Sequence, residues 1–295
     1  MTVKLLVVGL VPYDAGKTTI AESITLAIRD IGIKPLVYKP FSAHNWYLQY
    51  GTTIENLKSG MLFCEDILKL RKIADIKEPY EILNPVDTLM APLDPEYYIK
   101  NRMLRYYFIQ LNDNRSHIVA SRITIYVKQV NKHYNLILIN KRAIKGKTLI
   151  TKDIEKLVYN ADRILEEDRL DEYIAKLEQL RIPAITSTLS YLEEKYTHII
   201  IESYNDAAYP LPLNIKVDYV IAVSPGKAMI YDAKDYLKAI HLKAMISKTY
   251  QIKTSDILDL LKPRQIIKIP PITNPIQKLA VGTKILEKTI EEIIS

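Results

Sequence analysis

Cysteine and glycine are scarce in this chain of 295 residues. A single cysteine, Cys64, excludes an internal disulfide and a cysteine-based zinc cluster. No apolar run reaches the roughly 18 residues that a membrane-spanning helix needs, so no membrane partner is expected. Glycine occurs 8 times, whereas isoleucine, lysine and tyrosine are plentiful, a bias that suits a thermophile. With 48% hydrophobic and 25% charged residues, the chain can bury a substantial globular core.

The apolar N-terminus, MTVKLLVVGL, resembles a short signal peptide. The sequence Gly16-Lys17-Thr18 follows at once, which favours a buried β-strand over residues 3–9. We therefore expect a cytoplasmic protein.

Strands and helices alternate along most of the chain, which predicts an α/β fold with a mostly parallel sheet flanked by helices. Apolar runs predict strands at residues 3–9, 34–39, 198–202, 217–224 and 265–269. Helical periodicity predicts helices at residues 16–31, 61–74, 161–180, 187–196, 227–243 and from 275 onwards. From about Tyr106 to Asn140 the segments alternate like antiparallel strands. The chain is thus expected to be one domain, 1–295, with a small basic β-rich insertion at 100–147.

A phosphate-binding loop is predicted between the first strand and the first helix. Gly16 lets the backbone approach phosphate oxygens, and the first helical turn directs free amides and its positive dipole end at them. Lys17 can neutralise the β- and γ-phosphates, and the Thr18 hydroxyl suits a Mg²⁺ ligand. Six residues separate Gly9 from Gly16, whereas the Walker A motif has four. The predicted nucleotide-binding residues are Asp14, Ala15, Gly16, Lys17, Thr18 and Thr19.

Three further charged residues follow predicted strands or lie on the next helix. Glu202 ends an apolar strand, where it can hold Mg²⁺ directly or through water, or be a surface carboxylate. Asp66 lies on a predicted helix, where it is either a metal ligand or part of a solvated face. Lys39 ends the second strand and either reaches a transferring phosphate or faces solvent.

The order of these motifs resembles the dethiobiotin synthetase-like branch of P-loop proteins, in the SIMIBI class. The matching segments are DAGKTT, YKP, EDILKL, NPV with APLDP, and IIIE, at residues 14–19, 38–40, 65–70, 84–95 and 199–202. The resemblance covers roughly residues 1–95 and 195–275. It implies catalytic roles for Lys17 and Lys39 and a metal site of Thr18, Asp66 and Glu202. Such enzymes form a phosphorylated or carbamate-type intermediate with mainly electrostatic help.

The chain departs from that family in two loops. Ser203-Tyr204-Asn205-Asp206 replaces the glycines that follow the strand-end glutamate, and bulky residues over 41–47 replace small ones. These departures indicate a P-loop ATPase or GTPase other than dethiobiotin synthetase. His44, Asn45, Trp46 and Asn205 are candidate substrate residues, with His44 as a proton carrier. The alternative is a packed loop anchored by Trp46.

The segment from Lys100 to Lys147 contains eleven lysines or arginines and one acid, Asp113. Its interleaved cations and aromatics are suited to binding nucleic acid or another polyanion. The alternative is a structural or oligomerisation role, such as a homodimer contact.

Three functions remain open: an ATP-dependent enzyme (hydrolase, ligase or kinase-like) acting on an unknown small molecule, a nucleotide-regulated binding module, and a nucleic-acid-directed kinase. No N-K-x-D guanine motif is present, which favours ATP over GTP as the nucleotide bound with Mg²⁺.

Overall fold

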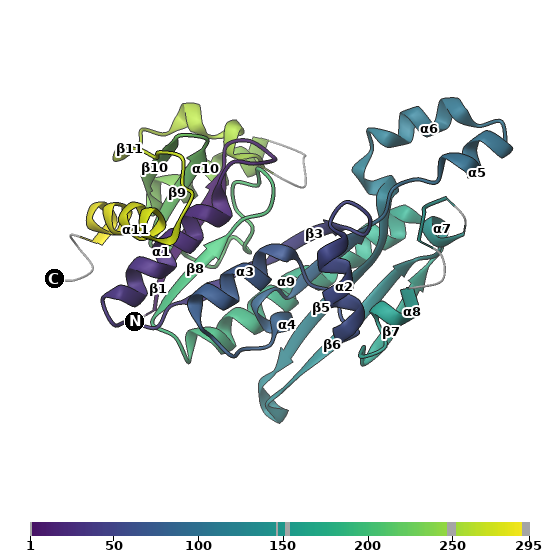
Figure 1. Cartoon of the computed structure of the whole chain (residues 1–295), viewed down its shortest axis with the longest axis horizontal. Coiled ribbons are helices and arrows are strands. Elements are labelled where there is room, and N and C mark those ends of the chain that lie inside the picture. The colour runs from purple at the N-terminus through teal and green to yellow at the C-terminus, as the bar shows by residue number, and fades with distance from the viewer. Residues whose placement is uncertain (1, 146, 151–153, 247–251, 291–295) are drawn as a thin grey trace. The chain divides into compact units, whose positions relative to one another are not determined.

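The structure is a computed structural model that describes residues 2–145, 147–150, 154–246 and 252–290 (Figure 1). The chain forms two compact units. Unit 1 comprises Met1–Phe41, Asp66–Glu78 and Ser190–Ser295, and unit 2 comprises Ser42–Glu65 and Pro79–Leu189. The second unit is therefore much larger than the expected insertion at 100–147.

Unit 1 is built on a sheet of six strands in the order β11-β10-β9-β1-β8-β2. The strands are β1 (Val3–Gly9), β2 (Leu36–Tyr38), β8 (His198–Glu202), β9 (Tyr219–Ser224), β10 (Lys227–Asp232) and β11 (Gln265–Lys268). β1 pairs in parallel with β8 and β9, and β8 pairs in parallel with β2. β10 is antiparallel to both β9 and β11. Because the parallel strands share one direction, their carboxyl ends meet at one edge of the sheet.

Helices flank the sheet of unit 1: α1 (Lys17–Asp30), α3 (Glu65–Ala74), α10 (Ala233–Ile246) and α11 (Pro275–Ile290). The inner part of β1 is fully buried, as its unbroken apolar sequence requires for a central parallel strand. α1 and α11 cross closely at Gly282, where an added Cβ would lie 1.9 Å from the Ser23 carbonyl oxygen. The two helices lie side by side in Figure 1.

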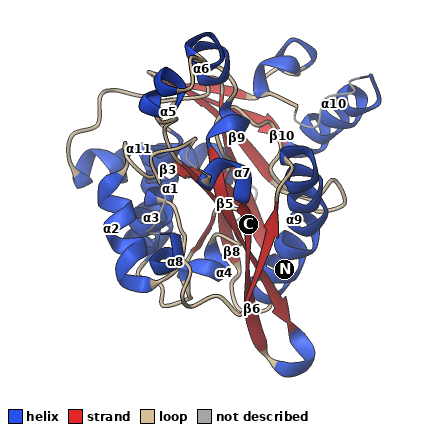
Figure 2. Cartoon of the chain, turned by 90° about the vertical axis from the view of Figure 1, so that its right-hand side faces the viewer, coloured by secondary structure: helices blue, strands red, loops and turns tan. Residues whose placement is uncertain are grey.

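Unit 2 contains a second sheet, ordered β3-β4-β5-β6-β7 (Figure 2). Its strands are β3 (Phe41–Asn45), β4 (Val86–Met90), β5 (Ile118–Val127), β6 (Lys132–Asn140) and β7 (Arg163–Glu167). β5 is antiparallel to β4 and β6, whereas β6 and β7 are parallel. The helices of this unit are α2 (Tyr50–Ser59), α4 (Tyr80–Leu83), α5 (Pro95–Lys100), α6 (Leu104–Leu111), α7 (Lys141–Ile144), α8 (Ile154–Leu157) and most of α9 (Leu170–Glu193).

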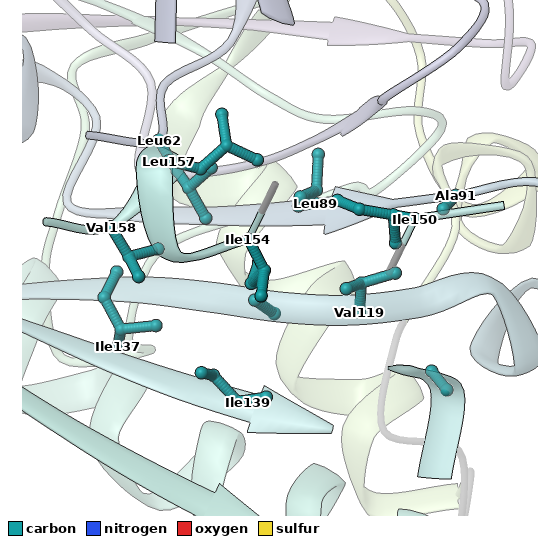
Figure 3. Packing of buried hydrophobic residues seen from close by; sticks show 12 residues of the cluster. Leu62, Leu89, Ala91, Val119, Ile137, Ile139, Ile150, Ile154, Leu157 and Val158 are labelled. Atoms are coloured by element: carbon teal, nitrogen blue, oxygen red, sulfur yellow. The ribbon is translucent and has the colours of Figure 1, made fainter. Parts of the chain in front are cut away.

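A hydrophobic cluster forms part of the core of unit 2 (Figure 3). Leu89, Val119 and Ile137 come from three neighbouring strands, and Ile154 and Leu157 of α8 pack with them. On α9, the Tyr173 hydroxyl donates a buried hydrogen bond of 2.6 Å to the Ser121 hydroxyl of β5. Burial of these side chains holds the strands and helices of unit 2 together.

The structure confirms an α/β fold with flanking helices, but parallel pairing is confined in unit 1 to the strands β9, β1, β8 and β2. The sheet of unit 2 is largely antiparallel.

Three local predictions are wrong. Residues 227–232 form β10 rather than the start of a helix, and α6 replaces the strand expected from Tyr106. Residues 163–167 of the helix expected at 161–180 form the strand β7. The remainder from Leu170, together with most of the helix expected at 187–196, is helical as predicted and belongs to one 24-residue helix, α9, which contains Pro183. No helix in the described part of the chain is long and apolar enough to cross a membrane.

Candidate phosphate-binding site

Two residues with positive φ shape the loop between β1 and α1. Asp14 and Gly16 both have left-handed backbones, with φ of 52° and 89°. Gly16 is the N-cap of α1 and offers no side-chain cap, so first-turn amides remain available to an anion. Asp14 is exposed, Ala15 is buried, and Thr19 is half-buried in the first turn. The loop thus presents backbone amides at the carboxyl end of the central strand.

Little space surrounds the backbone at Gly9, where β1 ends. An added Cβ would lie 3.0 Å from the Ala15 Cβ, 3.0 Å from the Asn205 carbonyl oxygen and 3.1 Å from Lys17 Nζ. Contacts this short are tighter than those of most real Cβ atoms, so a side chain at this position would require its neighbours to give by a few tenths of an ångström. Gly9 therefore lets the lysine and the loop after β8 approach each other.

The ammonium group of Lys17 lies over this crowded point. Its Nζ donates a hydrogen bond of 2.7 Å to the carbonyl oxygen of Asn205. Burial, together with repulsion from Lys39, lowers the pKa of Lys17, although Glu202 and Asp66 act in the opposite direction. The contact with Asn205 was not predicted, because a backbone carbonyl leaves no signal in the sequence.

The Thr18 hydroxyl lies between two carboxylates. It is 3.2 Å from Asp66 Oδ1 and 3.0 Å from Glu202 Oε1, within hydrogen-bonding distance of both. Glu202 is the last residue of β8, and Asp66 is the second residue of α3. Residues 18, 66 and 202 are thus brought together within unit 1.

Lys39 bridges the same two carboxylates. Its side chain is almost fully buried, and its Nζ lies 2.8 Å from Glu202 Oε1 and forms a short ion pair with Asp66. Lys39 directly follows β2, which is a neighbour of β8 in the sheet. One ammonium group therefore neutralises part of a site that contains two acids.

The two carboxylates of the site have opposite pKa shifts. Burial raises the pKa of Glu202 above its usual range, and Lys39 offsets this only in part. Burial also acts to raise the pKa of Asp66, but the charge of Lys39 and hydrogen bonds from Lys39 and Thr18 outweigh it and lower the pKa. The carboxylate whose pKa is lowered, Asp66, is the more exposed of the two, and the carboxylate whose pKa is raised, Glu202, is almost fully buried.

These residues fit a magnesium ion. The second oxygen of Glu202, Oε2, is buried and has no hydrogen-bond partner among the described residues. Such an oxygen is costly to bury unless a ligand or ion satisfies it. Hydroxyl and carboxylate oxygens are the ligands that Mg²⁺ prefers, usually with several waters. Among the residues that the structure describes, no group of three or more His, Cys, Asp or Glu is suited to a metal ion. The Thr18 hydroxyl and waters would therefore have to complete the set of metal ligands.

The other candidate substrate residues lie in unit 2 and have local roles there. His44 is fully buried, and its Nδ1 lies 2.8 Å from Asp87 Oδ2, although not in hydrogen-bonding geometry. The Asn45 side chain accepts hydrogen bonds of 3.0 Å from the amides of residues 47 and 48, which shapes a turn. Trp46 packs against the cluster shown in Figure 3. The fourth candidate, Asn205, lies in unit 1 and contacts Lys17.

The basic segment at 100–147 does not form one basic face. Arg122 is fully buried and donates hydrogen bonds to the Leu62 carbonyl at 2.5 Å and the Thr124 hydroxyl at 2.5 Å. Arg102 and Arg105 are exposed near α6, which precedes β5, whereas Lys128 and Lys132 are exposed at the turn that follows it. Figures 1 and 2 show α6 and this turn at opposite ends of the sheet. A single nucleic-acid surface over the whole segment therefore has no support in unit 2.

Comparisons of the chain with protein-family models, with curated proteins and with solved structures gave no match.

Proposed function

We propose that this chain is a P-loop nucleotide-dependent enzyme that binds ATP or GTP with Mg²⁺ in unit 1 and uses it to activate a small-molecule substrate. The observation that carries the proposal is the position of the Thr18 hydroxyl, which lies within 3.2 Å of both Asp66 and Glu202. Thr18 directly follows Lys17 and the left-handed Gly16. Phosphate-binding and metal-binding groups are therefore adjacent, as Mg·nucleotide requires.

Each side chain of the site has a role in this proposal. The first-turn amides and Lys17 bind the β- and γ-phosphates. Thr18, Asp66 and Glu202 would hold Mg²⁺, which, when bound, neutralises charge on the transferring phosphate. Lys39 orients the reacting group of the substrate and stabilises the charge that develops on it. The resemblance to the dethiobiotin synthetase-like branch supports ATP and a small carboxylate or amine as the substrates.

Calorimetric titration with Mg·ATP and Mg·GTP tests the nucleotide site. Lys17→Ala should weaken binding by roughly 10- to 150-fold, because it removes charge-assisted hydrogen bonds of about 1.5–3 kcal/mol. The matched control is Lys238→Ala, also in unit 1, whose side chain is 66% exposed and pairs only with neighbouring Asp235. Absence of binding heat with either nucleotide, or equal binding by the Lys17→Ala variant, would overturn the proposal.

A nucleotide-regulated binding module is the second candidate, and the Lys17–Asn205 contact favours it. The Asn205 carbonyl accepts one of the three hydrogen bonds that the Lys17 ammonium can donate, so a phosphate bound by Lys17 would compete with or adjoin the loop after β8. Lys39→Ala separates the two functions. Loss of product formation with intact nucleotide binding supports substrate chemistry, whereas unchanged hydrolysis supports a switch.

A further inference from the structure

An exposed apolar surface lies on α5 and α6 of unit 2, hereafter called the α5–α6 arm (Pro95–Leu111). Six large apolar side chains of the arm are 41% to 61% exposed: Ile99, Leu104, Tyr106, Phe108, Ile109 and Leu111. α6 has no buried residue at all. Figure 1 shows both helices at one end of the sheet of unit 2. An apolar patch of this kind is often a site of interaction.

The arm has an internal structure that fixes which side chains face outward. Tyr98 is buried, lies against the ring of Tyr107 at 5.5 Å, and donates a short hydrogen bond to the Gln110 side chain. Tyr107 and Gln110 are thereby turned inward. Leu104, Phe108 and Leu111, with i, i+4, i+7 spacing, form a stripe on the remaining surface. The base of the arm is anchored by the amide of Asp94, which donates to the Lys147 carbonyl at 2.9 Å.

Two exposed arginines lie on the same arm as this apolar stripe. Arg102 and Arg105 are exposed, and neither forms an ion pair within the described part of the chain. Lys100 is compensated by Glu96 on the same helix. The surface is therefore apolar and has uncompensated positive charge.

We propose that the α5–α6 arm is a docking surface for an anionic lipid membrane, into whose interface the apolar side chains insert. Aliphatic and aromatic side chains bordered by arginine are the composition that binds the boundary between headgroups and acyl chains. A single-stranded nucleic acid fits less well, because most of the stripe is aliphatic and offers no flat face for bases. The six side chains present roughly 500 Å² at half exposure, less than the roughly 800 Å² per partner of a stable protein interface.

Flotation with lipid vesicles tests the arm on the full-length protein. Wild-type protein should float with vesicles of phosphatidylcholine mixed with phosphatidylglycerol, and less with phosphatidylcholine alone. Phe108→Ser with Ile109→Ser should reduce the bound fraction by tenfold or more. Arg102→Gln with Arg105→Gln should weaken binding to the anionic vesicles by about 30-fold, as expected from the attraction of two cations to anionic lipid.

The control variant is Ile276→Ser, which removes an 80% exposed isoleucine from α11 and should not change flotation. Thermal unfolding of each variant shows whether it is folded, and all the substituted side chains are exposed. Absence of vesicle binding by the wild type overturns the proposal. The proposal is also overturned by a second result. In that result the wild type forms a dimer or a complex with single-stranded RNA that the Phe108→Ser, Ile109→Ser variant no longer forms, while the variant binds vesicles as well as the wild type does.

Discussion

Replacing Lys39 by methionine should destabilise unit 1 strongly at neutral pH. Lys39 is buried and bridges Asp66 and Glu202. Methionine keeps most of the volume but leaves two neighbouring carboxylates without their cation. Breaking a buried ion pair by removing one partner costs about 3–5 kcal/mol. The midpoint of thermal unfolding should fall by roughly 6–20 °C, at about 2–4 °C per kcal/mol.

The size of this effect should depend on pH. In the wild type, the raised pKa of Glu202 stabilises the fold at low pH, and this contribution is lost as the pH rises through the raised value. The lowered pKa of Asp66 contributes stability above its unfolded value, which is lost as the pH falls through the folded one. Without Lys39 both carboxylates bind protons more readily. The loss of stability should therefore be largest near pH 8 and smaller near pH 5.

Thermal unfolding of wild type and variant at about pH 8 and about pH 5, in the presence of EDTA, measures this difference. Lys238→Met is the control, because its exposed ion pair with Asp235 contributes at most about 1 kcal/mol. The Lys39 variant should regain part of its stability when millimolar Mg²⁺ replaces EDTA, since a cation again compensates the two acids. An unfolding midpoint that falls equally at both pH values would refute the electrostatic reasoning, as would a fall no larger than that of the control.

Three further substitutions test the packing around the site and in unit 2. Gly9→Ala should weaken Mg·ATP binding in calorimetry and cost about 1–3 kcal/mol of stability, because its Cβ would lie 3.0 Å from two neighbouring atoms. Gly282→Ala should destabilise unit 1 by a similar amount, about 1–3 kcal/mol in denaturant unfolding, by forcing α11 away from α1. Gly51→Ala has open space around its Cβ and should cause no loss in either assay. Arg122→Met should cost about 3–5 kcal/mol in denaturant unfolding because it leaves buried carbonyls unpaired, whereas the exposed Arg115→Met should change stability by less than about 1 kcal/mol.

The sequence predicted the inner part of unit 1 well because the strong local signals agree there. The run Val3–Gly9 is a strand with the expected bounds, and so is His198–Glu202. Each is a short, unbroken apolar segment, which in an α/β chain has few other structures open to it. The start of a helix after Gly16 was likewise predicted from a strong local signal in the sequence.

Edge elements were harder to predict because their sequences fit more than one structure. Residues 227–232, KAMIYD, are too short for their periodicity to separate a strand from the first turns of a helix. Residues 163–167, RILEE, form the edge strand β7. Their charged residues resemble those of the helical sequence pattern that follows, so the sequence does not separate the strand from the helix. In both cases the pairing partner decides the structure, and that partner is distant in sequence.

The candidate site could be predicted as a set of residues but not as a network. Lys39 and Glu202 are 163 residues apart, and only the order β1-β8-β2 places them side by side. The burial of His44 beside Asp87 depends likewise on unit 2, whose extent no local pattern indicated. Sequence spacing contains no information on such distant contacts.

The chain crosses between the two units four times, and this has a consequence for how the protein is made. β1 leaves the ribosome before the other strands of the two sheets, yet both of its sheet neighbours, β8 and β9, begin only at His198 and Tyr219. All residues of unit 2 have been synthesised once Leu189 is added. The strongly apolar β1 therefore stays unpaired during this time, while unit 2 can already fold around its own core. Nascent chains that stall before residue 198 thus expose the segment most prone to aggregate.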